Sequence, residues 1–171
     1  MKQACLLTGK PGVGKTTLIT EAVSRAERSV GGFYTREIRS RSTRKGFEIV
    51  TLDGNSAVLA HVDFDSPCRV SKYGVDQGNL DRLGVAALRH AVSECEIVII
   101  DEIGKMELFS PAFRQAVMEA IGSGRRVLGT VMLASHPWAD QIKKDPRVEI
   151  IEVSRANRDL VLHNLVEWIR G

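Results

Sequence analysis

The sequence predicts an α/β domain of three layers, in which a mainly parallel β-sheet has helices on both faces. A short apolar run at residues 4–8 is followed by a glycine-rich loop and then by a helical pattern. A second apolar run, at residues 97–101, is continuous rather than alternating, which is typical of a parallel strand buried on both faces. Strand-like and helix-like segments alternate through the second half of the chain, and this alternation indicates a parallel sheet.

The first half of the chain predicts one unit of the core and an antiparallel insertion. Two strand-like runs surround an Arg- and Ser-rich turn at residues 39–45, which predicts a hairpin. A third short strand follows, so we place the insertion at about residues 31–63, after the first helix. The expected elements are a strand at 4–8, a helix at 15–27 and strands at 30–38, 46–52 and 57–62.

The second half predicts strands that alternate with helices. Pro67 and Gly74 interrupt residues 64–76, which we expect to be irregular. Ser110 and Pro111 are typical of the cap and first turn of a helix. The apolar spacing predicts helices at 79–94, 111–121, 138–143 and 159–169, and strands at 96–101, 126–132 and 148–153. Right-handed crossovers would bring the loops to the carboxyl edge of the sheet, where nucleotides bind.

Composition excludes several classes of protein. The chain has 171 residues, of which 43% are hydrophobic and 26% are charged, so we expect residues 1–171 to form a single globular domain. The net charge of +3 does not by itself predict a nucleic-acid partner. The three cysteines lack C-x-x-C spacing, which indicates reduced thiols in a cytoplasmic protein. No apolar stretch reaches the roughly 18 residues of a membrane helix, so we expect no membrane partner.

Residues 9–16 read GKPGVGKT and match the phosphate-binding pattern G-x-x-x-x-G-K-[ST] at every fixed position. Between a strand and a helix, the N–H groups of this loop and the positive end of the helix would cradle a triphosphate. Lys15 would reach the β- and γ-phosphates, and the Thr16 hydroxyl would bind Mg²⁺. The pattern predicts a P-loop NTPase fold and a nucleotide site made of Gly9, Lys10, Pro11, Gly12, Val13, Gly14, Lys15, Thr16 and Thr17.

A second motif lies at the end of the apolar run 97–101. This strand would deliver Asp101 to the carboxyl edge of the sheet, close to the Mg²⁺ held by Thr16. Glu102 follows directly and would point toward the γ-phosphate, where a carboxylate can orient an attacking water. We therefore expect Thr16 and Asp101 to bind the metal, and Lys15 and Glu102 to act in catalysis.

The motifs together resemble a known family. In this order the chain contains GKPGVGKTTL, GGFYTREIR, GFEIVTLDG, DEIGKMELFSPAF, GRRVLGTV and SRANR. Essentially the whole chain is similar to the small nucleoside-triphosphatases of thermophilic prokaryotes, whose animal relative is called cancer-related nucleoside-triphosphatase. The resemblance implies slow, Mg²⁺-dependent hydrolysis of several ribonucleoside triphosphates to diphosphate and phosphate. It also implies a fold related to RecA-like or kinase-like P-loop domains.

Two further pairs of residues are candidates for the site. Lys105 and Glu107 lie just beyond Glu102, and Lys105 could neutralise charge on the γ-phosphate as an arginine finger does. A surface Lys–Glu pair explains the same residues. Asn157 and Arg158 precede the last helix, in a loop that often covers the base in P-loop folds, and an Arg can stack on any base. The alternative for Asn157 is a helix cap.

Other features leave alternatives open. Thr130 ends a strand near the phosphates, where it could sense the γ-phosphate, although ordinary packing explains it better. The basic residues around the hairpin turn could form a phosphate lid, an acidic-partner site or a nucleic-acid site. The interpretation we favour is a charged edge that prevents strand aggregation. These residues are Arg36, Arg39, Arg41, Arg44 and Lys45.

The sequence thus favours a nucleoside-triphosphatase over two alternatives. The first is a nucleotide or small-molecule kinase with an unidentified acceptor, in which hydrolysis would be leakage to water. The second is a switch that binds RNA or a protein partner through the basic hairpin, with an affinity that depends on nucleotide state. The sequence does not set the oligomeric state, and a monomer is compatible with it.

Overall fold

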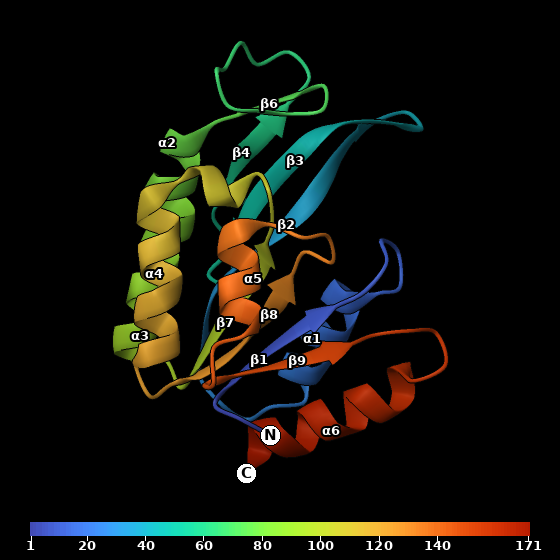
Figure 1. Ribbon diagram of the computed structural model, residues 1–171, viewed down its shortest axis with the longest axis vertical. Helices are drawn as coiled ribbons and strands as arrows, with labels where there is room; N and C mark the ends of the chain where they lie inside the picture. Colours follow the sequence, from blue (N-terminus) through green and yellow to red (C-terminus); the bar gives the residue numbers. More distant parts are fainter.

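A nine-stranded sheet runs through the whole molecule in the computed structural model, which describes residues 1–171 (Figure 1). The strands are β1 (Ala4–Thr8), β2 (Val30–Ser40), β3 (Thr43–Thr51), β4 (Ser56–His61), β5 (Arg69–Val70), β6 (Tyr73–Val75), β7 (Ile97–Ile103), β8 (Arg126–Val131) and β9 (Val148–Glu152). Their order across the sheet is β5-β6-β4-β3-β2-β7-β8-β1-β9. The predicted α/β fold is confirmed.

The sheet has a parallel core and an antiparallel extension. Strands β2, β7, β8, β1 and β9 are parallel, as the sequence predicts. The remaining four strands continue the sheet from β2 in antiparallel pairs. Because residues 30–34 of β2 pair with β7 and residues 33–40 pair with β3, the insertion is continuous with the core sheet.

Helices cover both faces of the core sheet (Figure 1). They are α1 (Lys15–Ser24), α2 (Gln77–Asn79), η1 (Leu80–Val85), α3 (Ala86–Glu94), η2 (Glu107–Phe109), α4 (Pro111–Gly122), α5 (Pro137–Lys143) and α6 (Arg158–Arg170). Alternate residues of β1 belong to two separate cores: Leu6 packs with α3, α4 and α5, whereas Leu7 packs with α1 and α6. None of these helices has the length and hydropathy that crossing a membrane requires.

The hairpin and the segment after it differ from the prediction. The expected turn at 39–45 is shorter, because β2 continues to Ser40 and β3 begins at Thr43. Glu37 supports this longer hairpin by pairing with Arg39 on its own strand at 2.6 Å and with Arg44 across it at 3.0 Å. Segment 64–76, expected to be irregular, contains the small β5–β6 hairpin. The first helix ends at Ser24, rather than at 27.

The helix predicted at 79–94 is present but is not a regular α-helix. Its middle, η1, is π-helical, and the helical stretch begins two residues earlier, at Gln77. Gly84 lies in this middle segment, where an added Cβ would be 3.1 Å from the Leu80 side chain and 3.7 Å from the Phe33 ring. The tight contact of that Cβ would be with Leu80 of the same segment, whereas its distance to Phe33 of β2 is an ordinary van der Waals contact. Apolar spacing predicts a helix but does not distinguish these two hydrogen-bonding patterns.

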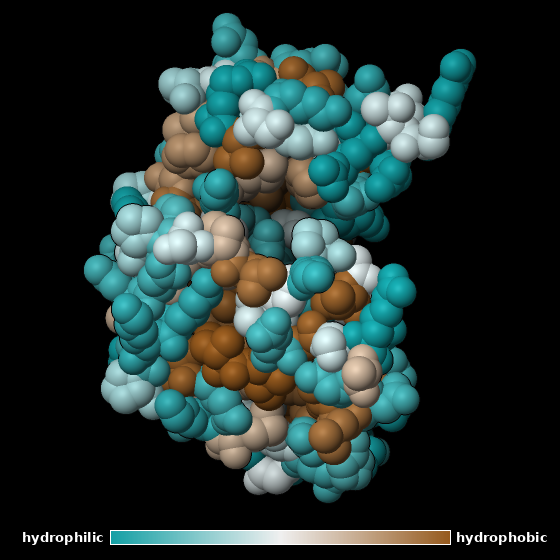
Figure 2. Space-filling view, turned by 45° about the vertical axis from the view of Figure 1, so that its right-hand side comes forward, coloured by the Kyte–Doolittle hydropathy of each residue, from teal (hydrophilic) through white to brown (hydrophobic).

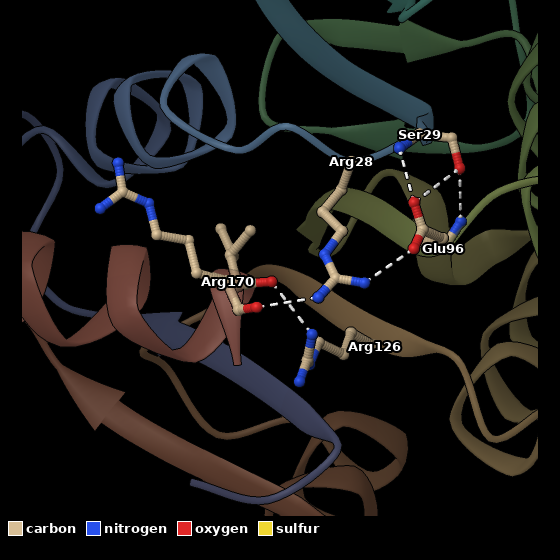
Figure 3. A network of polar contacts seen from close by, with 6 residues as sticks. Arg28, Ser29, Glu96, Arg126 and Arg170 are labelled. Carbon is tan, nitrogen blue, oxygen red and sulfur yellow. Dashed lines mark hydrogen bonds and ion pairs between the residues drawn. The ribbon is translucent and has the colours of Figure 1, made fainter.

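Two arginines hold the C-terminal end of α6 against the core (Figure 3). Arg28 donates to the carbonyl of Arg170 and to Glu96, both at 2.8 Å, and Arg126 donates to the carbonyl of Ile169 at 3.0 Å. These carbonyls have no partner within the helix, since the last turn of a helix leaves its acceptors free. Glu96 also accepts from the backbone N–H of Ser29. The network thus joins α6 to the beginnings of β2, β7 and β8.

Candidate functional site

The glycine-rich loop connects β1 to α1 at the carboxyl edge of the core sheet. Gly14 precedes α1 in a left-handed conformation (φ 89°). Gly9 has φ 144°, and a Cβ there would lie 2.5 Å from the carbonyl oxygen of Val153, so only glycine fits. The Lys15 ammonium donates to the carbonyls of Gly9 at 2.9 Å and Lys10 at 3.2 Å. The lysine side chain therefore lies across the mouth of the loop.

Asp101 lies in β7, two strands away from the loop, and is 3% exposed. Its Oδ1 accepts a hydrogen bond from the Thr130 hydroxyl at 2.5 Å, whereas its Oδ2 is buried without a hydrogen-bond partner. Burial raises the pKa of Asp101, and the hydroxyls of Thr130 and Thr16 and the charge of Lys15 partly oppose this rise. One carboxylate oxygen of Asp101 is therefore fixed and the other is available to a ligand.

Glu102 and Glu107 lie on either side of Gly104. A Cβ at Gly104 would be 2.7 Å from the Glu102 carboxylate and 3.1 Å from that of Glu107. Burial and the neighbouring charge of Asp101 raise the pKa of Glu102, while Lys15 lowers it. Burial raises the pKa of Glu107 well above its usual value, and the charges of Glu102 and Asp101 add to the rise. The site thus contains three acidic groups in a poorly solvated environment.

Most of the predicted catalytic and metal-binding residues line one cavity of about 780 Å³. Figure 2 shows a hollow at mid-height, between the upper part of the molecule, formed by the antiparallel strands, and the lower part. The loop after β1 forms one wall, the ends of β7 and β8 lie at the centre, and the β2–β3 hairpin forms the opposite wall. The predicted residues that meet here are Gly9, Pro11, Gly12, Gly14, Lys15, Thr16, Asp101, Glu102 and Lys105.

Lys105 and Glu107 do not form a surface pair. Lys105 is exposed at the rim of the cavity, whereas Glu107 is 3% exposed, and no ion pair joins them. The surface-pair interpretation is therefore wrong for Glu107. The 3₁₀ turn that begins at Glu107 directs this residue inward, and acidic character alone gave no signal of its burial.

Asn157 and Arg158 lie outside the cavity, and the side chain of Asn157 is already hydrogen-bonded within its own loop. Asn157 accepts from the N–H of Ser154 and donates to the carbonyl of Glu152, both at 2.8 Å. Asn157 occupies the N-cap position of α6, as the helix-cap interpretation predicts, but its side chain makes no hydrogen bond to the first turn of that helix. The Arg158 guanidinium packs against Gly14, where an added Cβ would lie 3.1 Å from it. Both residues support the loops around the site, and contact with a base remains a prediction.

For three contributors to this cavity, the sequence favoured an interpretation other than a role in the site. Thr130 was expected mainly to pack, but it is the hydrogen-bond donor to Asp101. For Arg36 and Arg44 the favoured interpretation was a charged edge, with a phosphate lid as an alternative; both side chains are exposed and also line the cavity wall opposite the loop. The apolar residues of that wall are Phe47, Leu59 and Val70, which lie in strands where alternation could have indicated them, and Met106, which lies between β7 and η2.

Together, the fold and the site define a P-loop NTPase: a phosphate-binding loop between a parallel strand and a helix, and an acidic residue on another buried strand of the same sheet. The family model described as NTPase matches residues 4–166, so the chain belongs to this nucleoside-triphosphatase family. The expected family and enzyme class are confirmed.

Relatives and solved structures agree along the whole chain. The nucleoside-triphosphatase THEP1 of Thermotoga sp. strain RQ2 is 44% identical over 165 residues, covering 96% of this chain and 94% of the relative. The human cancer-related nucleoside-triphosphatase is 38% identical, covering 100% and 98%. The crystal structure of THEP1 from Aquifex aeolicus superposes with a TM-score of 0.89 at 34% identity, covering 98% of this chain and 99% of that one.

Proposed function

We propose that this protein hydrolyses ribonucleoside 5′-triphosphates, ATP and GTP among them, to nucleoside diphosphate and phosphate, with Mg²⁺ and with little preference for the base. One observation carries the proposal: Lys15, Thr16, Asp101 and Glu102 line the same cavity. Relatives over the full length of the chain are named nucleoside-triphosphatases. The remaining support comes from what each of these side chains can do.

The loop and Lys15 would hold the phosphates. The backbone N–H groups of the loop, which ends in the left-handed Gly14 at the N-terminus of α1, would form an anion-binding nest. The ammonium of Lys15, which is satisfied by two carbonyls of the loop, can transfer its hydrogen bonds to the β- and γ-phosphates. Because these contacts reach groups that all nucleoside triphosphates share, they are consistent with hydrolysis of several bases.

Asp101 and Thr16 fit the binding of Mg²⁺. The unpartnered Oδ2 of Asp101 is a hard oxygen ligand, and the Thr16 hydroxyl lies close enough to lower the pKa of Asp101. Thr130 fixes the other carboxylate oxygen, so the free one has a defined direction. When bound, Mg²⁺ would neutralise charge on the β- and γ-phosphates.

Glu102 would orient the attacking water and accept its proton. It follows Asp101 on β7 and lines the cavity, and burial raises its pKa, which makes the carboxylate a stronger base. Lys105, exposed at the rim, would stabilise charge that develops on the γ-phosphate. Most of the catalysis would then come from positioning and electrostatics.

The direct test is phosphate release from ATP, GTP, CTP and UTP in the presence of Mg²⁺. Glu102→Gln should lower turnover by about 100-fold or more, since a positioned base contributes roughly that much. Its nucleotide affinity should remain close to that of the native protein, whereas Lys15→Ala should weaken binding itself. Phosphate release that is unchanged in Glu102→Gln would contradict the role of Glu102, and absence of release from all four nucleotides would contradict the function.

We also propose that residues 1–171 act as one domain, located in the cytoplasm. One sheet joins the core to the insertion, so the site is shared between them. The cysteines Cys5, Cys68 and Cys95 are free thiols, and burial raises the pKa of Cys5 to about 12, which makes it an unreactive core residue.

A further inference from the structure

The cavity extends beyond the place where the γ-phosphate would lie. In the sheet, the loop after β1 and the β2–β3 hairpin are on opposite sides of β7, the strand that carries Asp101 and Glu102. A nucleotide held by the loop would therefore direct its γ-phosphate toward Glu102, with the hairpin on the far side. A single attacking water does not require the space between Glu102 and the hairpin.

The far wall combines cations with an apolar surface. Phe47, Leu59, Val70 and Met106 form its apolar part. Arg36 and Arg44 lie on the same wall, and the Arg44 guanidinium is 5.2 Å from the centre of the Phe47 ring. The T-shaped pair of Phe47 and Tyr73, with ring centres 5.3 Å apart, fixes the aromatic surface.

The two arginines are held in place and keep donors free. Arg36 pairs with Glu48 through its Nε. Arg44 donates through Nε to the Tyr73 hydroxyl and through Nη1 to the Glu37 carboxylate, and both of these distances are 3.0 Å. The terminal nitrogens of Arg36 and Nη2 of Arg44 make none of these bonds. Preorganised guanidinium groups with free N–H are typical of sites that bind phosphate.

We propose that this wall is the subsite of a second substrate, a nucleoside monophosphate, which accepts the γ-phosphoryl group. The inference rests on the proposed binding of a triphosphate at the loop. The apolar residues would hold the base, and Arg36, Arg44 and the rim residue Lys105 would bind the phosphate dianion. They would also offset the repulsion of that dianion by Glu37, Glu102 and Glu107, which line the same cavity.

The transfer step balances without an additional reagent. A phosphate oxygen of the monophosphate forms a bond to the γ-phosphorus, and the bond from that phosphorus to the β–γ bridging oxygen breaks. The diphosphate leaves with the electron pair, so one triphosphate and one monophosphate give two diphosphates. The attacking oxygen is already ionised and no proton needs to be removed. Glu102→Gln should therefore lower phosphate release more than it lowers transfer.

The experiment uses ATP labelled in its γ-phosphate, Mg²⁺, the full chain and, in separate reactions, AMP, CMP, GMP and UMP. Transfer places the label in a nucleoside diphosphate, whereas hydrolysis places it in inorganic phosphate. The expected result is a labelled diphosphate with at least one of the four. Lys15→Ala, purified in parallel, should give neither product, which would exclude a contaminating kinase.

Two pairs of variants test the position of the subsite. Val70→Trp fills the far wall and should lower the ratio of labelled diphosphate to labelled phosphate by at least tenfold, whereas Val70→Ala should not. Arg44→Gln should lower the same ratio, and Arg41→Gln, at the exposed tip of the same hairpin, should leave it unchanged. If Val70→Trp does not fold, as judged by its thermal transition, the comparison of Arg44→Gln with Arg41→Gln tests the position of the subsite by itself.

The outcomes separate this inference from the proposed function. Labelled phosphate without labelled diphosphate from any of the four monophosphates would overturn the acceptor subsite and leave the triphosphatase standing. Transfer that does not respond to Val70→Trp or Arg44→Gln would also overturn the subsite. Absence of both products would mean that the proposed function itself is wrong.

Discussion

Thr130 and Asp101 form the most specific side-chain contact in the site. Their hydrogen bond joins residues 29 positions apart, at the ends of neighbouring strands β8 and β7. Both side chains are buried, so the bond lies in a region of low dielectric, where a hydrogen bond is stronger and the loss of a partner costs more free energy than in water. Thr130 thus acts as a positioning residue for Asp101.

Thr130→Val should lower turnover by roughly tenfold and raise the Mg²⁺ concentration needed for half-maximal rate, because the carboxylate loses the bond that orients it. Thr130→Ser keeps the hydroxyl and should recover most of the activity. Phosphate release measured over a Mg²⁺ titration checks this. A change in rate without a change in the Mg²⁺ dependence would mean that Thr130 acts through packing alone.

Glu107 should make the stability of the protein depend on pH. Its pKa in the folded state is raised above the unfolded value of about 4.3, so the folded state binds a proton more tightly. The free energy of unfolding should therefore fall as the pH rises above about 4.3, since the unfolded state releases that proton. Replacing the Glu107 carboxyl by a group that does not titrate should remove this decrease in the free energy of unfolding.

Glu107→Gln should accordingly raise the midpoint of thermal unfolding at pH 8 relative to the native protein, and change it much less at pH 4. Scans of the nucleotide-free protein at both pH values measure the difference. Glu167→Gln, at an exposed position of α6, is the matched control and should have no such pH dependence. Destabilisation by Glu107→Gln at pH 8 would contradict the pKa direction.

At the scale of elements, the position of the loop that connects β1 to α1 is set by backbone contacts more than by side-chain contacts. β1 is buried along its whole length, and α1 begins directly after Gly14, so the loop has little freedom to move at either end. Gly9 lies where this loop meets the end of β9, against the carbonyl of Val153. The position of the phosphate site is therefore set by how closely two chain segments approach each other.

Gly9→Ala should lower the free energy of unfolding by about 1–3 kcal/mol, because it forces a side chain into a conformation and a space that do not accept one. Gly122→Ala is the control: this residue is in α4, and its added Cβ would be 3.5 Å from its nearest neighbour. That variant should be neutral or slightly stabilising, as alanine favours helices. Chemical denaturation of both variants checks the difference.

At the scale of the whole molecule, the cavity lies between the parallel core and the antiparallel extension. Its walls come from the loop after β1, the ends of β7 and β8, and the hairpin, so the site exists only when the complete sheet has formed. The loop is also joined to α1, which packs on α6 in the second core. Binding at the loop should therefore stabilise the folded chain as a unit.

A non-hydrolysable ATP analogue with Mg²⁺ should raise the thermal midpoint of the native protein, and it should not raise that of Lys15→Ala. At a ligand concentration 100 times Kd, linkage gives about 2.7 kcal/mol of stabilisation. Differential scanning fluorimetry over an analogue titration measures this effect. Equal stabilisation of both proteins would show that the ligand binds away from the loop.

Several features were determined by the sequence alone. The α/β class, the parallel core strands and the phosphate loop could be predicted because each depends on neighbouring residues: a run of apolar side chains, a glycine at a tight turn, a helix directly after it. The order of the motifs also placed the chain in its family. The acidic residues Asp101 and Glu102 followed, since they end a recognisable strand.

Only the tertiary structure decided what surrounds that site. The pairing of β2 with β7 brings Arg36 and Arg44 to the cavity, although their spacing along the chain suggested an exposed edge. The Thr130–Asp101 bond, the burial of Glu107 and the engagement of Asn157 within its own loop likewise depend on packing. The physical reason is the range of the interactions. Local patterns report the conformation of adjacent residues, whereas hydrogen bonds and desolvation depend on partners that the fold brings from elsewhere in the chain.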